Sequence, residues 1–553
     1  MGGERWWNRK IPARKVEWVI FVLALIALVL LPLPRIGFLD DQHHAFLSSH
    51  GMTLAAHLSP EHHFLMYNRV VLDADGVERI EPYNRFSIVP FALIRCAMAF
   101  GGNDLIDQFI CARKLMLAFL LGAMFCAYLA FRRLRPGSWA VPVVIALAFS
   151  SKFCLYYGDM VFNDIPELFG CMLTFHGFVV YWQEKRFGQL LAKALMAVAL
   201  GWQIYAMILP VAVCIWLKER NSKDAIRLAT IPIAMGVLLL SFNFAQEYAA
   251  TRKPILEMPS VQSALGRMGL VQGEAYLAKR SNELSLNQAQ FVKQQILRAV
   301  YATTPAIVAP MMNAVYGALP GGTKINTPEE NGRLFALFAP IVAIAMIPLF
   351  VILLRRRKIS VVAAIPLISL ALLWSFPMKN FTMIHDFQGL FWIGMPLIFY
   401  DALFALFPEK SRVFPLFLTL ALLAGMGSFL RLSENKIYDS AESVARVAAL
   451  QSETSKFGGE VHPKVFVDGY PPRIVRAAHG LECALPHAVF ARRLEQADYV
   501  LHDDPVRIER MTKISALRLI DEANRKDPIS TNFGEIASEY GHNELKILRG
   551  GGV

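Results

Sequence analysis

The feature that most constrains this chain is a series of apolar segments, each about as long as a membrane-crossing helix. A helix needs roughly 20 consecutive apolar residues to cross the hydrocarbon core of a bilayer. Segments of that kind lie at 16–34, 108–131, 138–156, 163–182, 228–246, 332–354, 359–377, 387–407 and 413–430. A further apolar stretch, 189–217, is too long for one crossing and is interrupted at Gly201 and Gln203. It predicts two short helices, 189–201 and 204–217, which brings the predicted total to about eleven crossings.

The distribution of charge divides the chain at about residue 431. The 553 residues carry a net charge of +12 and are 18% charged, below the roughly 25% that is usual for soluble domains. Residues 431–553 hold 17 Lys/Arg and 18 Asp/Glu, so 39 of the 56 basic residues lie in the first 430. We therefore predict a transmembrane domain over 1–430 and a small soluble α/β domain over 431–553.

The basic residues of the first domain gather in a few short connections, which predicts its orientation. With the N-terminus inside, the cytoplasmic pieces would be 1–15, 132–137, 183–187, 218–227, 355–358 and 408–412. These 45 residues hold 20 Lys/Arg, whereas the other 385 before the tail hold 19. Such a bias is typical of cytoplasmic loops, and it explains the net charge without nucleic acid. We predict a multi-pass protein of the plasma (inner) membrane, with an uncleaved first helix and a cytoplasmic N-terminus.

In this orientation the loops 35–107 and 247–331 and the C-terminal domain face outside. The first loop opens with Asp40 and Asp41, directly after the first helix. Carboxylates at a membrane boundary are costly to desolvate and indicate function. The alternative is a solvated helix end with Asp40 as an N-cap. The loop also holds six of the 13 histidines, but their spacing matches no standard zinc pattern.

Several other polar residues fall on the same predicted face. Arg85 precedes an apolar stretch, 87–100, that is too short to span and is expected to lie along the interface as an amphipathic helix, where Arg85 could meet a lipid phosphate. Asp159 and Asp164 lie in the next outward turn. Asp164 starts a helix, so N-capping is the alternative role for it. Glu167, one turn inside that helix, needs a polar neighbour.

The turn after the ninth helix supplies Lys379 and His385 as candidates for contacting a phosphate. Interfacial snorkelling is the alternative for Lys379. An amphipathic stretch, 288–316, could lie on the membrane and cover a site. Carboxylates and cations at one interface suit chemistry on a lipid-anchored anionic substrate, because a carboxylate can serve as general base and cations can stabilise a departing phosphate.

At this level the sequence resembles the GT-C glycosyltransferases, in particular the bacterial branch related to protein O-mannosyltransferases and aminoarabinose transferases. The resemblance covers roughly residues 15–430 and lies in the order and spacing of motifs. These are Asp40-Asp41 after the first helix, the segment Arg85 to Phe100, Phe100-Gly101-Gly102-Asn103-Asp104 before the second helix, Arg132-Arg133-Leu134-Arg135 at its end, Asn163-Asp164 before the fourth helix, and the turn Gly201-Trp202-Gln203. That turn lacks the lysine that the family often has.

The resemblance implies transfer of a sugar from a polyprenyl-phosphate donor to an acceptor glycan, lipid or protein at the outer face, with inversion at the anomeric carbon. It implies Asp40 as catalytic base, Asp41 as an assisting or substituting carboxylate, and Asp164 and Arg85 as residues that shape the site. No cofactor or obligatory metal is expected, although oligosaccharyltransferases need a divalent cation.

Two other functions stay open at this stage. A transporter or flippase of the same lipid would need polar residues at the midplane, for which His176, Gln203 and Glu167 are candidates. A membrane scaffold that presents the C-terminal domain would leave the acidic pair unexplained. Within the tail, 464–469 and 497–504 predict short buried strands, with helices expected near 440–453 and 505–525.

Overall fold

The structure is a computed structural model that describes most of the first 303 residues and parts of the remainder. The described residues are 13–30, 45–72, 75–220, 222–268, 270, 288–303, 361–378, 386–404, 448–450, 452–458, 460, 462–468, 488–491, 496–503 and 506–510. This part of the chain is mostly helical with a few short strands. The predicted segments 332–354 and 413–430, together with Asp40, Asp41, Lys379 and His385, lie outside it.

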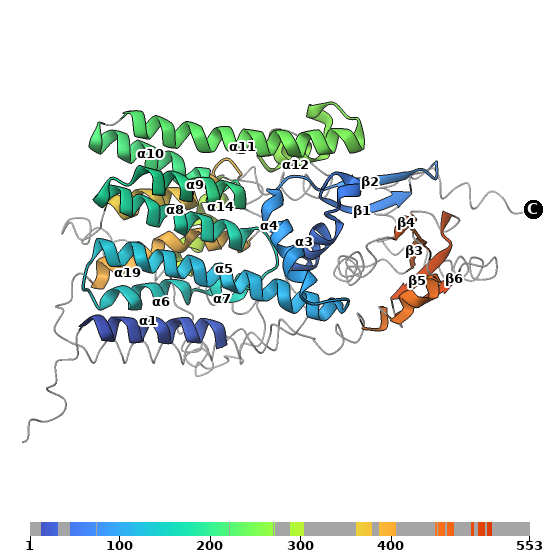
Figure 1. Cartoon of the computed structure of the whole chain (residues 1–553), viewed down its shortest axis with the longest axis horizontal. Helices are drawn as coiled ribbons and strands as arrows, with labels where there is room; N and C mark the ends of the chain where they lie inside the picture. Colours follow the sequence, from blue (N-terminus) through green and yellow to red (C-terminus); the bar gives the residue numbers. More distant parts are fainter. Residues whose placement is uncertain are drawn as a thin grey trace, which may run out of the picture.

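The helices form a bundle in which most of the long helices run side by side (Figure 1). Its members are α1 (Ala13–Leu30), α5 (Leu105–Leu134), α6 (Ala140–Phe149), α7 (Lys152–Tyr157), α8 (Asp164–Glu184), α9 (Phe187–Leu200), α10 (Tyr205–Glu219), α11 (Ser222–Thr251), α17 (Val361–Ser375), the 3₁₀ helix η4 (Asp386–Ile393) and α19 (Gly394–Phe404). All ten side chains of α6 are buried, so α6 lies at the centre of the bundle. The predicted helical pair over 189–217 is confirmed as α9 and α10.

The segment 138–156 forms two helices, which corrects the prediction of a single one. α6 ends before Ser150, and α7 begins after Ser151. Ser150 turns its hydroxyl back to the Leu147 carbonyl, at 2.9 Å. Ser151 caps α7 by accepting a hydrogen bond from the Cys154 amide, at 3.4 Å. Serine side chains compete in this way with the helix for backbone hydrogen-bond partners. Two adjacent serines therefore divide an apolar segment that composition alone predicts to be one helix.

Helix length supports fewer membrane crossings than the eleven predicted. Among the described residues, α5 and α11 are the two helices long and apolar enough to cross a membrane by length and composition. Several further apolar helices reach only 10–17 residues. A crossing needs roughly 20 residues, so these shorter helices do not meet the length requirement by themselves. α6 and α7 follow one another closely, however, and η4 runs directly into α19.

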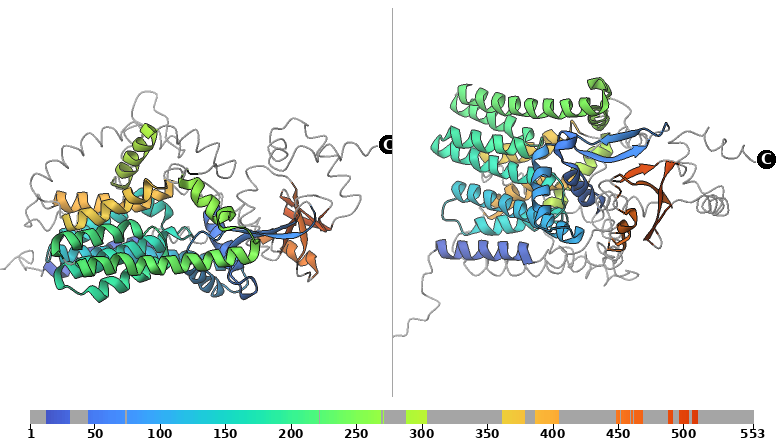
Figure 2. Two further views of the ribbon diagram at one scale, coloured as in Figure 1. Left: turned by 90° about the horizontal axis from the view of Figure 1, so that it is seen from above. Right: turned by 45° about the vertical axis from the view of Figure 1, so that its right-hand side comes forward.

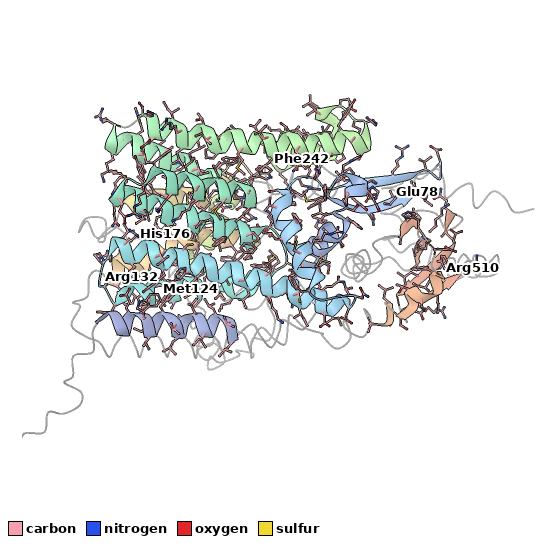
Figure 3. The ribbon with its side chains drawn as sticks, viewed as in Figure 1. Glu78, Met124, Arg132, His176, Phe242 and Arg510 are labelled. Atoms are coloured by element: carbon pink, nitrogen blue, oxygen red, sulfur yellow. The ribbon has the colours of Figure 1, made fainter. Side chains whose placement is uncertain are left out.

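Much of the outer surface of the bundle is apolar. Only 22% of the apolar 18-residue part of α11 is buried. Side chains such as Leu238 are largely exposed, at 71%. Phe242, also on α11, is 46% exposed (Figure 3). α1 and α10 likewise expose valine, leucine and tryptophan side chains. A contiguous apolar exterior of this kind marks a surface made to contact lipid or another protein.

One end of the bundle, which we call the basic end, is held together by arginines at the end of α5. Arg132 pairs with Glu17 of α1 at 3.2 Å, and Arg135 pairs with Asp401 of α19 at 2.5 Å. Arg133 pairs with Glu184, at the end of α8. Figure 3 places Arg132 at the left end of the bundle, away from the strands. The cytoplasmic connections predicted around these residues therefore meet at one end.

Beyond the opposite end lie the elements of the first predicted outer loop. They are α3 (Ala45–His57), the 3₁₀ turn η2 (Pro60–His62), the strands β1 (Tyr67–Leu72) and β2 (Glu78–Pro82), and α4 (Ile88–Ala99). The second loop adds η3 (Ile255–Glu257) and α12 (Pro259–Met268), and also α14 (Gln288–Thr303), which lies beside the bundle and packs against η4 and α19. α4 confirms the helix predicted over 87–100, and α14 confirms the first part of the stretch 288–316. The rest of that stretch lies outside the described residues.

The hairpin of the first loop and the C-terminal domain share one sheet. The C-terminal strands are β3 (Lys464–Asp468), β4 (Val489–Ala491), β5 (Tyr499–Asp503) and β6 (Val506–Arg510), with the 3₁₀ turn η5 (Thr454–Phe457) beside them. The sheet order is β2-β1-β4-β3-β5-β6, and β1 pairs with β4 in parallel. Both views in Figure 2 show these strands beyond the same end of the bundle. The C-terminal domain is thus joined to the loop that follows the acidic pair.

The strands expected over 464–469 and 497–504 are confirmed as β3 and β5. The helix expected over 505–525 is wrong at its start, because residues 506–510 form β6. The apolar Val506 and Ile508 alternate with the charged Arg507 and Glu509, and Ile508 is 1% exposed. A period of two is a strand signal. Residues 511–525 lie outside the described part of the chain.

The pairing of β1 with β4 predicts which engineered cysteines can be joined. Val70 lies opposite Val489 in the register, so the pair Val70→Cys and Val489→Cys should form a disulfide under mild oxidation. Val465 on β3 lies one strand further from β1, about 9–10 Å away at the usual strand spacing, which is too far for a bridge. Val70→Cys with Val465→Cys is therefore the matched control. Peptide mapping reads the outcome, and bridging in the control alone would contradict the shared sheet.

Candidate functional site

A buried polar cluster lies at the end of the bundle opposite the basic end, and we call this the polar end. At its centre is Asp164, the first residue of α8, which is 2% exposed. Gln388 of η4 donates its side-chain amide to Asp164 Oδ1 at 3.0 Å. Gln388 Oε1 in turn accepts from Trp374 Nε1 at 2.9 Å and from Gln203 Nε2 at 3.4 Å. The amide orientation of Gln388 is therefore set by its donors, with its NH₂ group turned to the carboxylate.

A second carboxylate, Glu167, lies one turn further along α8 and is also buried. Its Oε1 accepts from Asn163 Nδ2 at 2.9 Å and from the Trp202 amide at 3.2 Å. Asn163, the N-cap residue, makes no side-chain capping bond. The capping role considered for Asp164 is thus replaced by contacts with η4. The polar neighbour that Glu167 was expected to need is the turn between α9 and α10.

That turn approaches Glu167 so closely that residue 201 must be glycine. A Cβ built on Gly201 would lie 1.8 Å from Glu167 Oε1 and 2.1 Å from its carboxyl carbon. The Glu167 side chain is buried and bonded to two partners, so it has little room to give way. Gly201 therefore lets the α9–α10 turn present the Trp202 amide to the carboxylate. The conformation at Gly201 is extended, so close approach explains the glycine better than backbone strain does.

Gly201→Ala is expected to destabilise the protein by about 1–3 kcal/mol, because overpacking a buried site costs that much. The measurement is thermal unfolding of the full chain in detergent. Gly188→Ala is the matched control, since Gly188 lies on the same helix, α9, and a Cβ there would meet nothing within 4 Å. Combining Gly201→Ala with Glu167→Ala removes the clash and should recover part of the loss. Equal unfolding midpoints for the wild type and Gly201→Ala would contradict the close contact.

Arg85 reaches the same region from the first loop. Its guanidinium lies 3.8 Å from the centre of the Tyr83 ring and donates to Ser263 Oγ of α12. Its backbone carbonyl accepts from Trp202 Nε1 at 3.2 Å. Trp202 thus joins Arg85 to the turn that holds Glu167. The structure brings Arg85 and Asp164 to one end of the bundle.

Two arginines of the second loop were missed by sequence reasoning. Arg267, one turn after Ser263 on α12, interacts electrostatically with the Asp164 carboxylate and lies 6.0 Å from the centre of the Phe86 ring. Arg298 of α14 is 6% exposed. α14 packs against η4, the element that carries Gln388. For Arg298 the only sequence signal was the amphipathic stretch 288–316, which indicates a cover for a site but not which of its cations are buried.

The remaining predicted site residues are only partly placed. Asp159 is 5% exposed in the connection between α7 and α8, where the neighbouring Val161 amide donates to Ser48 Oγ at 3.2 Å. That bond ties the connection to α3. Asp40, Asp41, Lys379 and His385 lie outside the described residues. Their predicted roles stay predictions.

His50 and His57 of the first loop pack as aromatic groups. His50 is buried edge-on against Tyr83, with ring centres 4.3 Å apart. His57 stacks on Tyr67 at 4.1 Å, and its Nδ1 lies 2.7 Å from the Tyr67 carbonyl. Burial raises the pKa of the Tyr67 hydroxyl to about 12, and nearby Glu61 adds to the effect. Among the residues that the structure describes, no group of three histidines, cysteines or carboxylates is arranged to hold a metal ion.

The chemical capacity of the cluster lies in its unused carboxylate oxygens. Asp164 Oδ2 and Glu167 Oε2 are buried and accept no hydrogen bond from any described residue. Such atoms can accept hydrogen bonds from hydroxyl groups, and the positive charge of Arg267 acts on Asp164. A ligand that carries both hydroxyls and an anionic group matches this arrangement. Comparison of the sequence with models of known protein families, and with curated proteins, finds no match.

Proposed function

We propose that this protein is an integral membrane glycosyltransferase. It would move a sugar from a polyprenyl-phosphate donor to an acceptor at the extracytoplasmic face, by inversion, with Asp40 or Asp41 as general base. In this proposal the fold is a GT-C-like bundle of about eleven membrane segments, of which helix length supports α5 and α11. The protein would lie in the plasma membrane with its N-terminus in the cytoplasm.

The single observation that carries the proposal is that arginines gather at one end of the bundle, each paired with a carboxylate, while buried carboxylates with unused oxygens lie at the other end. Arg132, Arg133 and Arg135 gather at the basic end, whereas Asp164 and Glu167 are buried at the polar end. A basic end is expected to face the cytoplasm. The buried carboxylates then lie at the outer face, on the same side as the loop that begins with Asp40 and Asp41.

The apolar exterior supports a membrane location. Large side chains such as Leu238 and Val237 on α11 are exposed over more than half of their surface, which water would disfavour and lipid tails would not. The hairpin β1–β2, which exposes Glu78 and Arg79, lies beyond the polar end of the bundle (Figure 1). A lipid-linked donor could then reach the site from the bilayer while an acceptor approaches from outside.

The site residues have distinct roles in this proposal. A carboxylate of the acidic pair takes the proton from the acceptor hydroxyl, and that oxygen attacks the anomeric carbon. The bond to the lipid phosphate breaks, and the phosphate leaves with its electron pair. Arg85, Lys379 and His385 are proposed to contact that phosphate, with Arg267 as a further cation near the site. Asp164 and Glu167 would accept hydrogen bonds from sugar hydroxyls, and Asp159 would help to shape the same region.

The test is purification of the full chain and incubation with a panel of polyprenyl-phosphate sugars and candidate acceptors. Release of polyprenyl phosphate that depends on both donor and acceptor is the expected result. Reconstitution in vesicles with a labelled donor separates the enzyme from a transporter, because a transporter moves the lipid intact and the enzyme splits it. Movement without cleavage would refute the proposal.

The transporter alternative loses two of its three candidate residues. Gln203 and Glu167 are bonded into the cluster at the polar end. His176 lies within α8, where its Nδ1 is 3.1 Å from Lys193 Nζ of α9, and it is labelled within the bundle in Figure 3. A carrier site needs several polar groups near the midplane. His176 and Lys193 form a single half-buried pair, which falls short of such a site. The transferase is therefore favoured.

A further inference from the structure

The turn between α10 and α11 carries cations that differ from the paired arginines of the basic end in their ion pairing. Arg132, Arg133, Arg135 and Arg186 are each neutralised by a carboxylate of the chain. Arg220, Lys223 and Arg227 are exposed and form no ion pair with a described residue. One group of cations at the basic end is thus paired with carboxylates of the chain, and a second group is exposed without such pairs.

The acidic residue between Lys223 and Arg227 is already engaged. Asp224 accepts a hydrogen bond from the Tyr181 hydroxyl at 2.9 Å, which holds it toward α8. Lys223 and Arg227 are four residues apart on α11 and therefore lie on one helix face, where like charges repel. Arg220 is the residue directly after α10, and it lies only three residues before Lys223. An external anion between these three side chains would relieve the repulsion.

The same turn exposes large apolar side chains beside the cations. Trp216 and Leu217 on the last turn of α10 are 53% and 60% exposed, and Ile226 on the first turns of α11 is 58% exposed. Tryptophan with exposed aliphatic groups and basic residues is the pattern of a segment that sits at the boundary between lipid tails and headgroups. Nucleic acid or an acidic protein would use the cations but not this apolar surface.

We infer that Arg220, Lys223 and Arg227 bind the phosphate of an anionic phospholipid headgroup, with Trp216, Leu217 and Ile226 against its acyl chains. The inference rests on the membrane location proposed above and not on the sugar-transfer reaction. We call these six residues the lipid-binding turn. Its occupant is a phosphodiester lipid of the leaflet that faces the basic end.

The test is binding of dioctanoylphosphatidylglycerol to the full chain in detergent, followed by microscale thermophoresis. The wild type should bind it more tightly than dioctanoylphosphatidylcholine, and salt should weaken the binding. The double variant Lys223→Gln with Arg227→Gln should bind roughly 30-fold more weakly, as expected for two basic residues at an anionic lipid surface. The control is Arg252→Gln with Lys253→Gln, an exposed basic pair at the other end of α11, which should bind like the wild type.

Four outcomes would overturn the inference. The first is undiminished binding by the double variant with an unchanged unfolding midpoint. The second is an equal loss in the control pair, which would mean that net charge alone is measured. The third is equal affinity for glycerol 3-phosphate, which has the headgroup anion and no acyl chains. The fourth is displacement of the lipid by a short oligonucleotide at equal concentration. Because no sugar donor is present, loss of the transferase proposal would leave this result unaffected.

Discussion

Replacing Asp40 with Asn is expected to lower kcat for sugar transfer by about 10²- to 10⁴-fold, the usual contribution of a general base. Asparagine has nearly the same shape as aspartate but cannot take a proton from the acceptor hydroxyl. The loss should therefore appear in kcat, with donor binding and protein yield preserved. The measurement is the rate of polyprenyl-phosphate release by purified protein, with donor affinity determined separately.

Asp41→Asn is the matched comparison, since the two carboxylates are adjacent and either could be the base. A large loss in one and a small loss in the other would assign the roles. Full activity in both single variants and in the double variant would exclude the acidic pair from the chemistry. The scaffold alternative would then gain weight, because it needs only the C-terminal domain and its binding partner.

Asp164→Asn is the second change with a large expected effect, a roughly 10- to 150-fold loss in kcat/KM. Hydrogen bonds to charged groups contribute about 1.5–3 kcal/mol, which corresponds to that range. The Oδ1 position can keep its bond from Gln388, which is 3.0 Å long, so the fold should survive. The free Oδ2 would become an amide that donates instead of accepting, and a sugar hydroxyl bound there would lose its partner.

The control is Asp107→Asn, which removes one negative charge from the exposed first turn of α5 at the same end of the bundle. It should leave the kinetics unchanged. A substitution such as Asp164→Leu would not be informative, because leaving the Gln388 amide unpaired and buried costs about 1–3 kcal/mol by itself. If Asp164→Asn matched the wild type in kcat/KM, Asp164 would be a structural residue that only anchors η4 to α8.

Several parts of the fold could be predicted because their determinants are local. The pair α9 and α10 follows from a run too long for one crossing with a Gly201 break, and α4 follows from a short apolar stretch. The gathering of Arg132, Arg133 and Arg135 at one end follows from charge distribution along the chain. These features depend on a few neighbouring residues and on the length of a bilayer, so no tertiary contact is needed to find them.

Other features could not be predicted because they depend on residues far apart in the chain. Asp164 and its partner Gln388 are 224 residues apart. Nothing near Asp164 distinguishes a carboxylate that caps a helix from one that is buried against η4. The break between Ser150 and Ser151 was also missed, since the choice between a continuous helix and two shorter ones depends on which backbone groups the two hydroxyls reach.

By itself, the sequence determined that the chain is dominated by apolar helices and that arginines gather at one end of them, and it predicts a soluble tail from about residue 431. Hydropathy and charge are properties of composition and spacing, and they need no partner. Only the tertiary structure decided that Glu167 requires Gly201 beside it, that the charge of Arg267 acts on Asp164, and that β1 of the first loop pairs with β4 of the tail. Those results follow from close packing, in which one missing Cβ or one strand register selects among contacts that the sequence leaves equally open.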